Sequence, residues 1–453
     1  MSIEQSNIVI KLGETVEIKS PDRLRIQQQV NEHATIYFRE QINGNIAKYR
    51  RLVEGQTGIC VYPVNSPSHR LSSDAPRILF QGIATKIEVR YDPDGADYIE
   101  VFGMSYTYLM DITRKRRSFQ NKKQSLREMV NEILTGYPNA LCIIDHTIGK
   151  NLLKRFLLQW NETDWDYLKR VASVLLNTVL VANSVAEKPV LSIGIPEGRE
   201  RHLDSHCRLN YEISSVMEDS EFGLQLNRSR FDDKLDENDR FYFTFTDTNE
   251  IYQIGDRINF HQRVLTVCKI TAELKGNILK FSYIMATPNG LKVPRIYNEA
   301  IVGQAISGKV MDVNDSSVKI DLEIDQGRKF DKEQASWFPY ATPYTGGGRS
   351  GWYFMPEIGD KVQLTFPSNR EEQAYVIYAV RNKQTHSTDD PQIKYLRIKD
   401  GKELRFGPKE LVITGKDKSV YIQMTEDEGI TINSNTNITL EAKGKILLAA
   451  NEN

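Results

Sequence analysis

The C-terminal segment sets the strongest limit on the fold of this 453-residue chain, because it has too little apolar surface for a core of its own. Between residues 394 and 450, short alternating runs such as "GITINSNTNITLEAKGKILLAA" are joined by Gly, Asp or Asn turns, and Phe and Trp do not occur after Phe406. Thin strands of this kind are not stable alone. We therefore expect three copies to wrap around a common axis, each supplying one face of a prism. The residues predicted to meet on that axis are Ile430, Ile432, Ile438, Leu440, Ile446 and Leu448.

Most of the remaining sequence shows the two-residue alternation that is typical of half-buried β-strands. Runs such as "RILFQGIATKIEVRYD" and "RVLTVCKITAEL" are bounded by Gly, Asp and Pro turns. The predicted fold class is mainly β with a small α/β insert. We expect a first β-barrel at 1–110, a helical insert at 111–177, a second barrel or sandwich at 178–290, a linker at 291–300, a small five-stranded barrel at 301–385 and the prism at 386–453.

Two helices are predicted in the insert. "SLREMVNEIL" begins with Ser125 and has Glu128 three residues later, which indicates a capping box. "NETDWDYLKRVASVLL" repeats the plan, with Thr163 as N-cap and Asp166 as its partner. Both carry apolar residues at helical spacing, which we assign to a core. These are Leu126, Met129, Val130, Ile133 and Leu134 in the first helix and Trp165, Leu168, Ala172, Leu175 and Leu176 in the second.

The charge balance argues against a chain that binds nucleic acid along its whole length. The 59 Lys and Arg residues are matched by 60 Asp and Glu residues, whereas nucleic-acid binders are basic. The one dense basic cluster, "RKRRSFQNKK" at 114–123, lacks the aromatic ladder of a single-strand binding site. We interpret it either as a solvated strand end or as a contact surface for an acidic partner.

The cysteines and the N-terminus indicate an intracellular origin. Cys60, Cys142, Cys207 and Cys268 are spread singly, which is typical of reduced structural cysteines. The N-terminus lacks a basic region followed by an apolar run, and no stretch approaches the about 18 apolar residues of a membrane span. We expect a protein made soluble in the cytosol without a signal peptide.

The sequence offers little for catalysis or metal binding. The one close set of ligand types, His202, Asp204, His206 and Cys207, lies in a predicted loop or strand and lacks the base of an HExxH motif. The glycines at 346–348 lead into a strand, whereas a phosphate-binding loop leads into a helix. No G-x-S-x-G motif is present, and the acidic pairs lie in polar turns. We therefore predict no enzyme, no cofactor and no metal centre.

An aromatic and glycine-rich stretch, "WFPYATPYTGGGRSGWYFMPEIGDKVQLTF" at 337–366, carries the most specific pattern. Together with "RKRRSFQNKKQSLREMVNEIL" and "QWNETDWDYLKRVAS" it resembles the VgrG spike proteins and the phage late-control D proteins, over about residues 80–450. In that family a W-x-P-x-A-x-P strand leads through a Gly-rich loop to P-x-x-G-D-x-V-x-x-x-F. The matching residues are Trp337, Pro339, Ala341, Pro343, Gly346, Gly347, Gly348, Pro356, Gly359, Asp360, Val362 and Phe366.

This resemblance implies the baseplate hub and spike of a contractile injection system, such as type VI secretion, a phage tail or a bacteriocin. It implies a homotrimer in which two hub barrels form a ring under a six-fold tail tube, followed by an OB-like barrel and an intertwined triangular β-prism, or trimeric β-helix. Baseplate proteins, secreted effectors, the target-cell membrane and a PAAR-like tip protein are the implied partners. The tip contact is expected at Leu447, Leu448, Ala449 and Ala450.

Two other classes of function compete with this one. Prism strands also occur in tailspikes, and exposed aromatic rings could stack on sugars, so a carbohydrate-binding or depolymerising tail component is the main alternative. It needs paired acids beside the aromatic residues, and the sequence shows no such pair. An OB-like barrel could also bind single-stranded nucleic acid, but the stretch "DVNDSSVKIDLEIDQG" is too acidic for that, and we expect no nucleic-acid binding.

Overall fold

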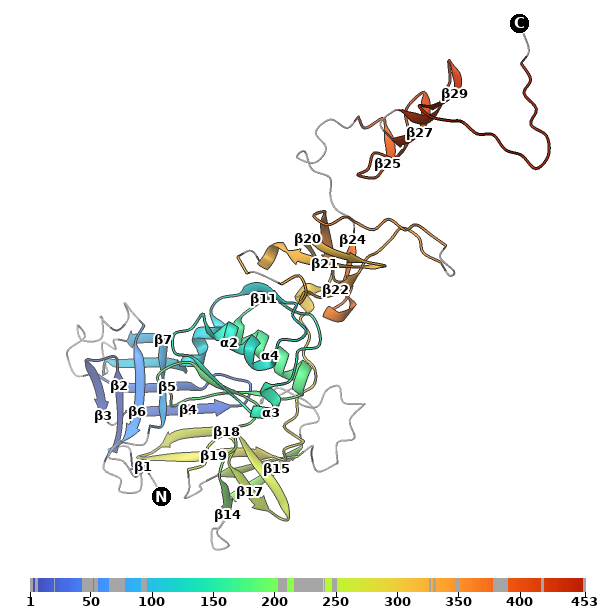
Figure 1. The fold of residues 1–453 in the computed structure, drawn as a ribbon. Coiled ribbons are helices and arrows are strands. Elements are labelled where there is room, and N and C mark those ends of the chain that lie inside the picture. Colours follow the sequence, from blue (N-terminus) through green and yellow to red (C-terminus); the bar gives the residue numbers. More distant parts are fainter. Residues whose placement is uncertain are drawn as a thin grey trace. The chain divides into compact units, whose positions relative to one another are not determined.

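The computed structural model describes residues 3–4, 7–19, 21–42, 52, 56–64, 78–90, 96–202, 210–215, 239, 241–246, 251–325, 327–328, 331–346, 350–377, 390–416 and 419–450. This part of the chain is mainly β, as the sequence predicted (Figure 1). The chain separates into two compact units, Met1–Ala379 and Val380–Asn453.

The first module of the larger unit consists of antiparallel strands with alternating side chains. β2 buries Ile8, Ile10 and Leu12 and exposes Lys11, for example. The strands pair in the order β4-β5-β8-β7-β6-β2-β3. They are β2 (Ile8–Leu12), β3 (Val16–Lys19), β4 (Arg23–Gln29), β5 (Thr35–Gln41), β6 (Gly58–Pro63), β7 (Phe80–Arg90) and β8 (Tyr98–Ser105). The short strand β1 (Ile3–Glu4) pairs instead with residues 278–279 of the second module.

The second module, at 200–286, is also formed by strands. β17 and β18 form a hairpin whose two turn residues, His261 and Gln262, both have positive φ angles of 45° and 63°. Two-residue hairpin turns favour this backbone because its twist matches that of the strands. The strands are β14 (Glu200–His202), β15 (Asn210–Ser215), β16 (Phe241–Thr246), β17 (Arg257–Phe260), β18 (Arg263–Lys275) and β19 (Ile278–Ala286).

The pairing of β4 with β18 joins the two modules. Its register places Ile26 opposite Ala272 and Arg25 opposite Glu273. Among the described residues, the resulting sheet has fourteen strands, and one apolar core contains side chains from both modules. The two barrel-forming regions predicted from the sequence therefore share a sheet, although the insert separates them along the chain.

The insert lies between the two modules in the sequence. It follows a short 3-10 helix, η3 (Tyr106–Asp111), and contains a two-stranded ribbon, β9-β11, and a three-stranded sheet, β10-β13-β12. β13 pairs with β10, and β12 pairs with β13, so these two strands join the sheet of the insert although they follow residue 177, where the sequence placed its end. Its elements are β9 (Lys115–Phe119), α2 (Leu126–Leu134), β10 (Leu141–Ile144), α3 (His146–Gly149), β11 (Leu157–Glu162), α4 (Asp164–Leu176), β12 (Leu180–Ala182) and β13 (Val190–Ile193).

Both predicted helix starts are confirmed. Ser125 and Glu128 form the capping box of α2, and the Thr163 side chain accepts a hydrogen bond from the Asp166 amide at the start of α4. α2 buries all five predicted residues. α4 buries Trp165, Leu168 and Ala172 of the predicted stripe, whereas Leu175 and Leu176 are only partly buried. Tyr167 and Arg170 are buried as well, so this helix is enclosed on more than one face. Asn177, in the left-handed conformation, ends α4.

The third module, at 299–377, is a five-stranded sheet in the order β22-β21-β20-β23-β24. A parallel bridge between Tyr340 and Val376 also brings the chain after β22 next to β24, so the two ends of the sheet meet. Its strands are β20 (Ala305–Asn314), β21 (Ser317–Leu322), β22 (Trp337–Pro339), β23 (Lys361–Thr365) and β24 (Tyr375–Ile377). Short 3-10 turns lie at η5 (Glu299–Ile301), η6 (Glu323–Asp325) and η8 (Glu371–Gln373).

The smaller unit contains a meander of five antiparallel strands, drawn in orange and red in Figure 1. Residues 435–450 follow the last strand and form no regular secondary structure. The strands, which follow one another in sequence order, are β25 (Lys394–Arg397), β26 (Glu403–Phe406), β27 (Glu410–Lys416), β28 (Val420–Thr425) and β29 (Gly429–Ser434).

Candidate assembly surfaces

The C-terminal sheet places most of its apolar side chains on one face, which we call the apolar face; the buried Val412 lies on the opposite face, between Arg405 and Gln423. The register of the strands aligns these residues in two rows. The first row crosses all five strands and consists of Leu396, Leu404, Ile413, Ile422 and Ile432. The second row consists of Phe406, Leu411, Met424 and Ile430.

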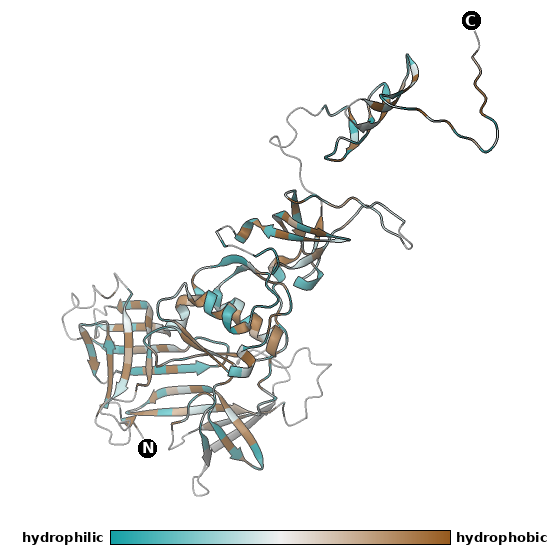
Figure 2. Ribbon diagram, viewed as in Figure 1, coloured by the Kyte–Doolittle hydropathy of each residue, from teal (hydrophilic) through white to brown (hydrophobic). Residues whose placement is uncertain are grey.

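The apolar face is largely open to solvent in the single chain. Ile430 is 67% exposed and Ile432 is 55% exposed, and Leu396, Phe406, Ile413 and Met424 are exposed as well. Figure 2 shows brown and teal residues interspersed along these strands, as alternation between two faces requires. A contiguous apolar surface of this kind marks a contact site, because leaving it in water costs free energy.

The opposite face of the same sheet is mainly polar and has its own partners. Arg405 Nη2 lies 2.8 Å from Glu410 Oε1, and Gln423 Nε2 donates a 2.9 Å hydrogen bond to Glu410 Oε2. Arg397 pairs with Glu403 on this face. The asymmetry between the faces means that only the apolar face requires a covering surface.

The predicted prism residues fall into two groups. Ile430 and Ile432 belong to β29 and to the apolar face. The other four lie in residues 435–450, where a single chain has no paired strand to hold them, and all four are exposed: Ile438, Leu440, Ile446 and Leu448. The residues expected to contact a tip are the most exposed apolar group, with Leu447 at 86% and Leu448 at 87%, followed by exposed Ala449 and Ala450.

The stretch at 337–366 contributes four buried residues, two of them aromatic, to the core of the third module: Phe338, Val362, Leu364 and Phe366. Phe338 and Phe366 are buried, and their rings lie 5.0 and 6.4 Å from the ring of Phe156 in the insert. Trp337, by contrast, is on the outer face of β22, where the Lys319 ammonium lies 4.8 Å from its ring centre. Pro339 is also exposed.

The loop that follows β22 carries exposed aromatic rings. Gly346 N donates to Ser350 O, and Trp352 N donates to Tyr344 O, each at 2.9 Å, so the loop closes on itself like a hairpin. Gly351 has a φ of +132°, and a Cβ there would lie 2.6 Å from Tyr344 O. The loop leaves the side chains of four aromatic residues about half exposed or more: Tyr344, Trp352, Tyr353 and Phe354.

The remaining motif residues have separate positions. Gly347 and Gly348 lie outside the described residues, and Pro343 lies at the base of the aromatic loop. After Pro356, Gly359 takes a φ of +99°, and Asp360 Oδ2 accepts a 2.9 Å hydrogen bond from Glu357 N. Val310 N donates to Asp360 O and Gly359 N donates to Val310 O, at 2.9 and 2.8 Å, which fixes this turn on β20.

The basic cluster at 114–123 is used mostly inside the insert. Lys115 Nζ lies 2.6 Å from Asp164 Oδ2, and Arg117 pairs with the same fully buried carboxylate. The Arg116 guanidinium lies 4.3 Å from the ring centre of Trp160. Neither interpretation of the cluster from the sequence includes these contacts, because Asp164 is distant in sequence and enters the network only through folding.

An unpredicted buried network joins the insert to the third module. Arg170 of α4 donates through Nε to Glu162 at 2.7 Å, through Nη2 to the Leu158 carbonyl at 2.6 Å and through Nη1 to Glu371 at 3.1 Å. Glu371 Oε1 also accepts the Leu158 amide at 2.9 Å. Burial lowers the pKa of Arg170, but the charges of Glu371 and Glu162 outweigh this and raise the pKa above its ordinary value.

A second buried carboxylate lies at the same junction. Asp325 accepts a 2.8 Å hydrogen bond from the Ser118 amide and one from the Ser118 hydroxyl, and it pairs with Arg328 at 2.9 Å. Arg328 also pairs with Glu132 of α2. Burial raises the pKa of Asp325, although its hydrogen bonds and Arg328 oppose the shift. These polar groups are satisfied across the boundary between insert and third module.

The remaining observations concern possible metal ligands, the cysteines and membrane-spanning helices. Within the described ranges, no three His, Cys, Asp or Glu side chains are arranged to hold a metal ion. Of the histidine cluster, Asp204, His206 and Cys207 lie outside the described residues. Cys60, Cys142 and Cys268 are free thiols, as the sequence indicated. No helix in the described part of the chain is long and apolar enough to cross a membrane.

Comparison with known proteins identifies the third module first. Residues 306–380 match the family described as the type VI secretion system/phage-baseplate injector OB domain. No curated protein matches the chain. We therefore call the third module the OB domain.

Several solved structures share the fold of this chain over a range much longer than the OB domain, at low sequence identity. The E. coli c3393 protein, a type VI secretion component with structural similarity to T4 tail proteins gp27 and gp5, is 11% identical. The structural match covers 81% of this chain and 98% of the E. coli chain, with a TM-score of 0.53. A chain of the half-lidded Francisella PdpA–VgrG complex is 10% identical. The match covers 94% of this chain and 88% of that one, with a TM-score of 0.57. The lidless PdpA–VgrG complex is 11% identical, covering 95% and 98%, with a TM-score of 0.55. The chain thus carries a baseplate-injector OB domain, and its resemblance to VgrG-like baseplate spike proteins is confirmed.

Proposed function

We propose that the chain is the non-enzymatic, homotrimeric hub and spike of a contractile injection apparatus. In this proposal the two hub modules act as barrels in a ring under a six-fold tail tube, and the OB domain leads to a three-fold prism. The trimer would carry a membrane-piercing tip and deliver it on contraction. The baseplate-injector OB domain and the VgrG-like fold support a baseplate spike role.

The apolar face of the C-terminal sheet carries the proposal of a trimer. Two rows of aliphatic and aromatic side chains lie on one face, whereas on the other face Glu410 pairs with Arg405 and Gln423. Three copies that turn their apolar faces toward a common axis would remove this surface from water and form a closed core. The exposed segment 435–450 would then gain partner strands from neighbouring copies.

The proposed partners follow from the same architecture. A hexameric tube and other baseplate proteins would contact the hub ring, and a PAAR-like protein would bind the C-terminal end through Leu447, Leu448, Ala449 and Ala450. The PdpA–VgrG complexes and the phage tail proteins named in the comparisons favour baseplate or effector partners. No cofactor, metal or nucleic acid is part of the proposal.

Mass measurement of the full chain tests the trimer, and a pair of double variants tests its surface. I413K/I432K places two charges on the apolar face, whereas T414K/T431K places them at the neighbouring positions on the opposite face. We expect wild type and T414K/T431K to be trimers in analytical ultracentrifugation. For I413K/I432K we expect half-dissociation at a concentration at least about tenfold higher, because buried charges without partners are costly. A monomeric wild-type chain at all concentrations would reject the proposal.

One observation favours the second candidate function. The exposed rings of Tyr344, Trp352, Tyr353 and Phe354 are suited to stacking on sugars. A carbohydrate-binding or depolymerising role predicts binding of cell-wall saccharides that is lost in W352A/Y353A, or release of reducing sugar. Absence of both activities in the full chain would leave the spike proposal as the better one.

A further inference from the structure

β11 of the insert contributes side chains to two separate cores. Leu157 points into the core of the insert, with Leu126, Trp165 and Leu168 of the two helices. Its neighbour Leu158 belongs instead to the core of the OB domain. Both leucines are completely buried. The alternation of a strand therefore serves the insert on one face and the OB domain on the other.

The OB-domain side of this strand is extensive. Phe156, Leu158 and Trp160 all belong to the same apolar cluster as the OB strands β20, β21 and β23. The ring of Phe156 lies between those of Phe338 and Phe366, at 5.0 and 6.4 Å. These contacts span more than 140 residues of sequence, and their partners from the insert lie outside the range matched by the OB family, 306–380.

Buried polar groups fix the same junction at several points. The Leu158 amide and the Arg170 guanidinium share Glu371, and Ser118 of β9 holds Asp325. Gln120 Nε2 donates to the Ile320 carbonyl at 3.1 Å, and the Ser336 hydroxyl donates to the Gln120 carbonyl at 2.7 Å. A sliding or hinging movement would break these bonds in a buried setting, which is unfavourable.

We infer that the OB domain is not self-contained: the β9-β11 ribbon of the insert completes its core and holds it as a rigid extension of the hub. If the chain has the proposed function, mechanical load on the hub reaches the OB domain through a junction without a hinge. This consequence rests on the proposed function. The structural coupling does not, and it can be tested in the full chain whether or not the chain is a trimer.

A matched pair of variants separates core completion from general destabilisation. L158A removes the side chain that faces the OB domain, and L157A removes the same atoms from the adjacent position that faces the insert. Hydrogen exchange with mass spectrometry reports each region. We expect L158A to speed exchange in β20, β21 and β23 by about tenfold or more. L157A should act mainly on α2 and α4.

Two results would overturn the inference. OB-domain exchange in L158A equal to wild type would mean that the ribbon only rests against a finished core. Equal loss of protection in the OB domain from L157A and L158A would mean that any destabilisation of the insert speeds hydrogen exchange in the OB domain. Because exchange is measured within one chain, a failed trimer proposal would not change either reading.

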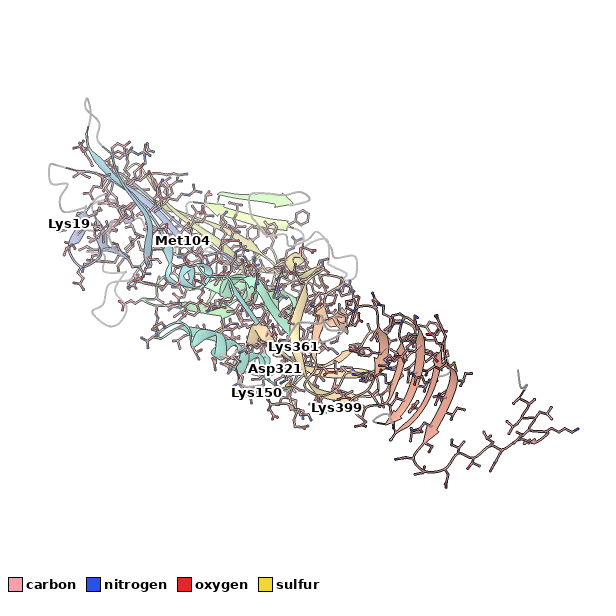
Figure 3. The ribbon with its side chains drawn as sticks, turned by 90° about the horizontal axis from the view of Figure 1, so that it is seen from above. Lys19, Met104, Lys150, Asp321, Lys361 and Lys399 are labelled. Carbon is pink, nitrogen blue, oxygen red and sulfur yellow. The ribbon has the colours of Figure 1, made fainter. Side chains whose placement is uncertain are left out.

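A distance measurement tests rigidity directly. Lys150 of the insert and Lys361 of the OB domain are exposed and are labelled in Figure 3, so unnatural amino acids at both can carry spin labels. With labelled chain diluted in an excess of unlabelled chain, so that distances between copies do not contribute, we expect one narrow distance distribution. It should broaden when L158A is combined with E371Q. A broad distribution in the otherwise unchanged chain would reject the rigid junction.

Discussion

Arg170 and Glu371 form a fully buried ion pair, with Nη1 and Oε1 3.1 Å apart, although 201 residues separate them in the sequence. Arg170 belongs to α4 of the insert and Glu371 to a short turn of the OB domain. The same carboxylate accepts the Leu158 amide. The pair therefore joins a helix, a ribbon strand and a second domain at one point.

Breaking this pair is expected to destabilise the larger unit strongly. In E371A, the Leu158 amide loses its acceptor and Arg170 keeps only Glu162 and a carbonyl as partners. We expect a loss of about 3–5 kcal/mol in the free energy of unfolding, measured with urea by circular dichroism. E273A removes a partner of the exposed Lys275, at 3.7 Å, and should cost less than about 1 kcal/mol. Similar losses in both variants would contradict the special role of the buried pair.

Replacement of Gly351 tests the conformation of the aromatic loop. In G351A the new Cβ would approach Tyr344 O, at a φ that alanine rarely adopts. We expect a cost of about 1–3 kcal/mol, or an opened loop with altered near-ultraviolet circular dichroism from Trp352 and its neighbours. G444A is the control, because a Cβ there meets no atom within 4 Å. An unchanged spectrum and stability in G351A would show that the loop closes differently.

The Cys142 and Cys268 thiols are expected to react slowly with alkylating reagents. Burial raises the pKa of the Cys142 and Cys268 thiols to about 12, so at pH 8 only about one thiol in ten thousand is ionised. Peptide mass spectrometry after iodoacetamide treatment at pH 8 should find Cys268 unmodified and the half-buried Cys142 modified only slowly in the folded chain, and both modified in guanidinium. Rapid modification of Cys268 without denaturant would contradict its burial.

The same shifts have a consequence for stability at high pH. In the unfolded chain these thiols ionise near pH 8.5, whereas in the folded chain they stay neutral until about pH 12. The unfolded state therefore releases protons first, and stability should fall as pH rises from about 8.5 toward 12. C268A should flatten this part of the curve of unfolding free energy against pH.

Deletion of residues 444–453 tests the proposed tip contact. This truncation removes Leu447, Leu448, Ala449 and Ala450 but leaves all five strands of the C-terminal sheet. We expect the truncated chain to form a trimer by mass and to lose co-purification of a PAAR-like partner. The double variant L447S/L448S should behave in the same way. A truncated chain that still retains its tip would place that contact elsewhere.

Local patterns in the sequence were sufficient for many elements of the fold, although β10 and α3 of the insert were not predicted. Ser125 and Glu128 cap α2 as predicted, because the signal depends only on residues three apart. Ile430 and Ile432 occupy the same face of β29, as their spacing required. The aromatic and glycine motif led to the OB domain, since it combines several fixed distances within one stretch.

The sequence could not show what lies on the far side of each element. No element was predicted for "LLQWNE", and only the tertiary structure forms β11 there and divides Leu157 and Leu158 between two cores. From its place in a helical sequence, Arg170 would be expected to face solvent, but in the folded chain it pairs with Glu371 from a turn distant in sequence. The row from Leu396 to Ile432 likewise exists only once the register of five strands is set. Periodicity reports which side chains share a face, whereas burial, ion pairs and register depend on segments far apart in the chain, and these meet only on folding.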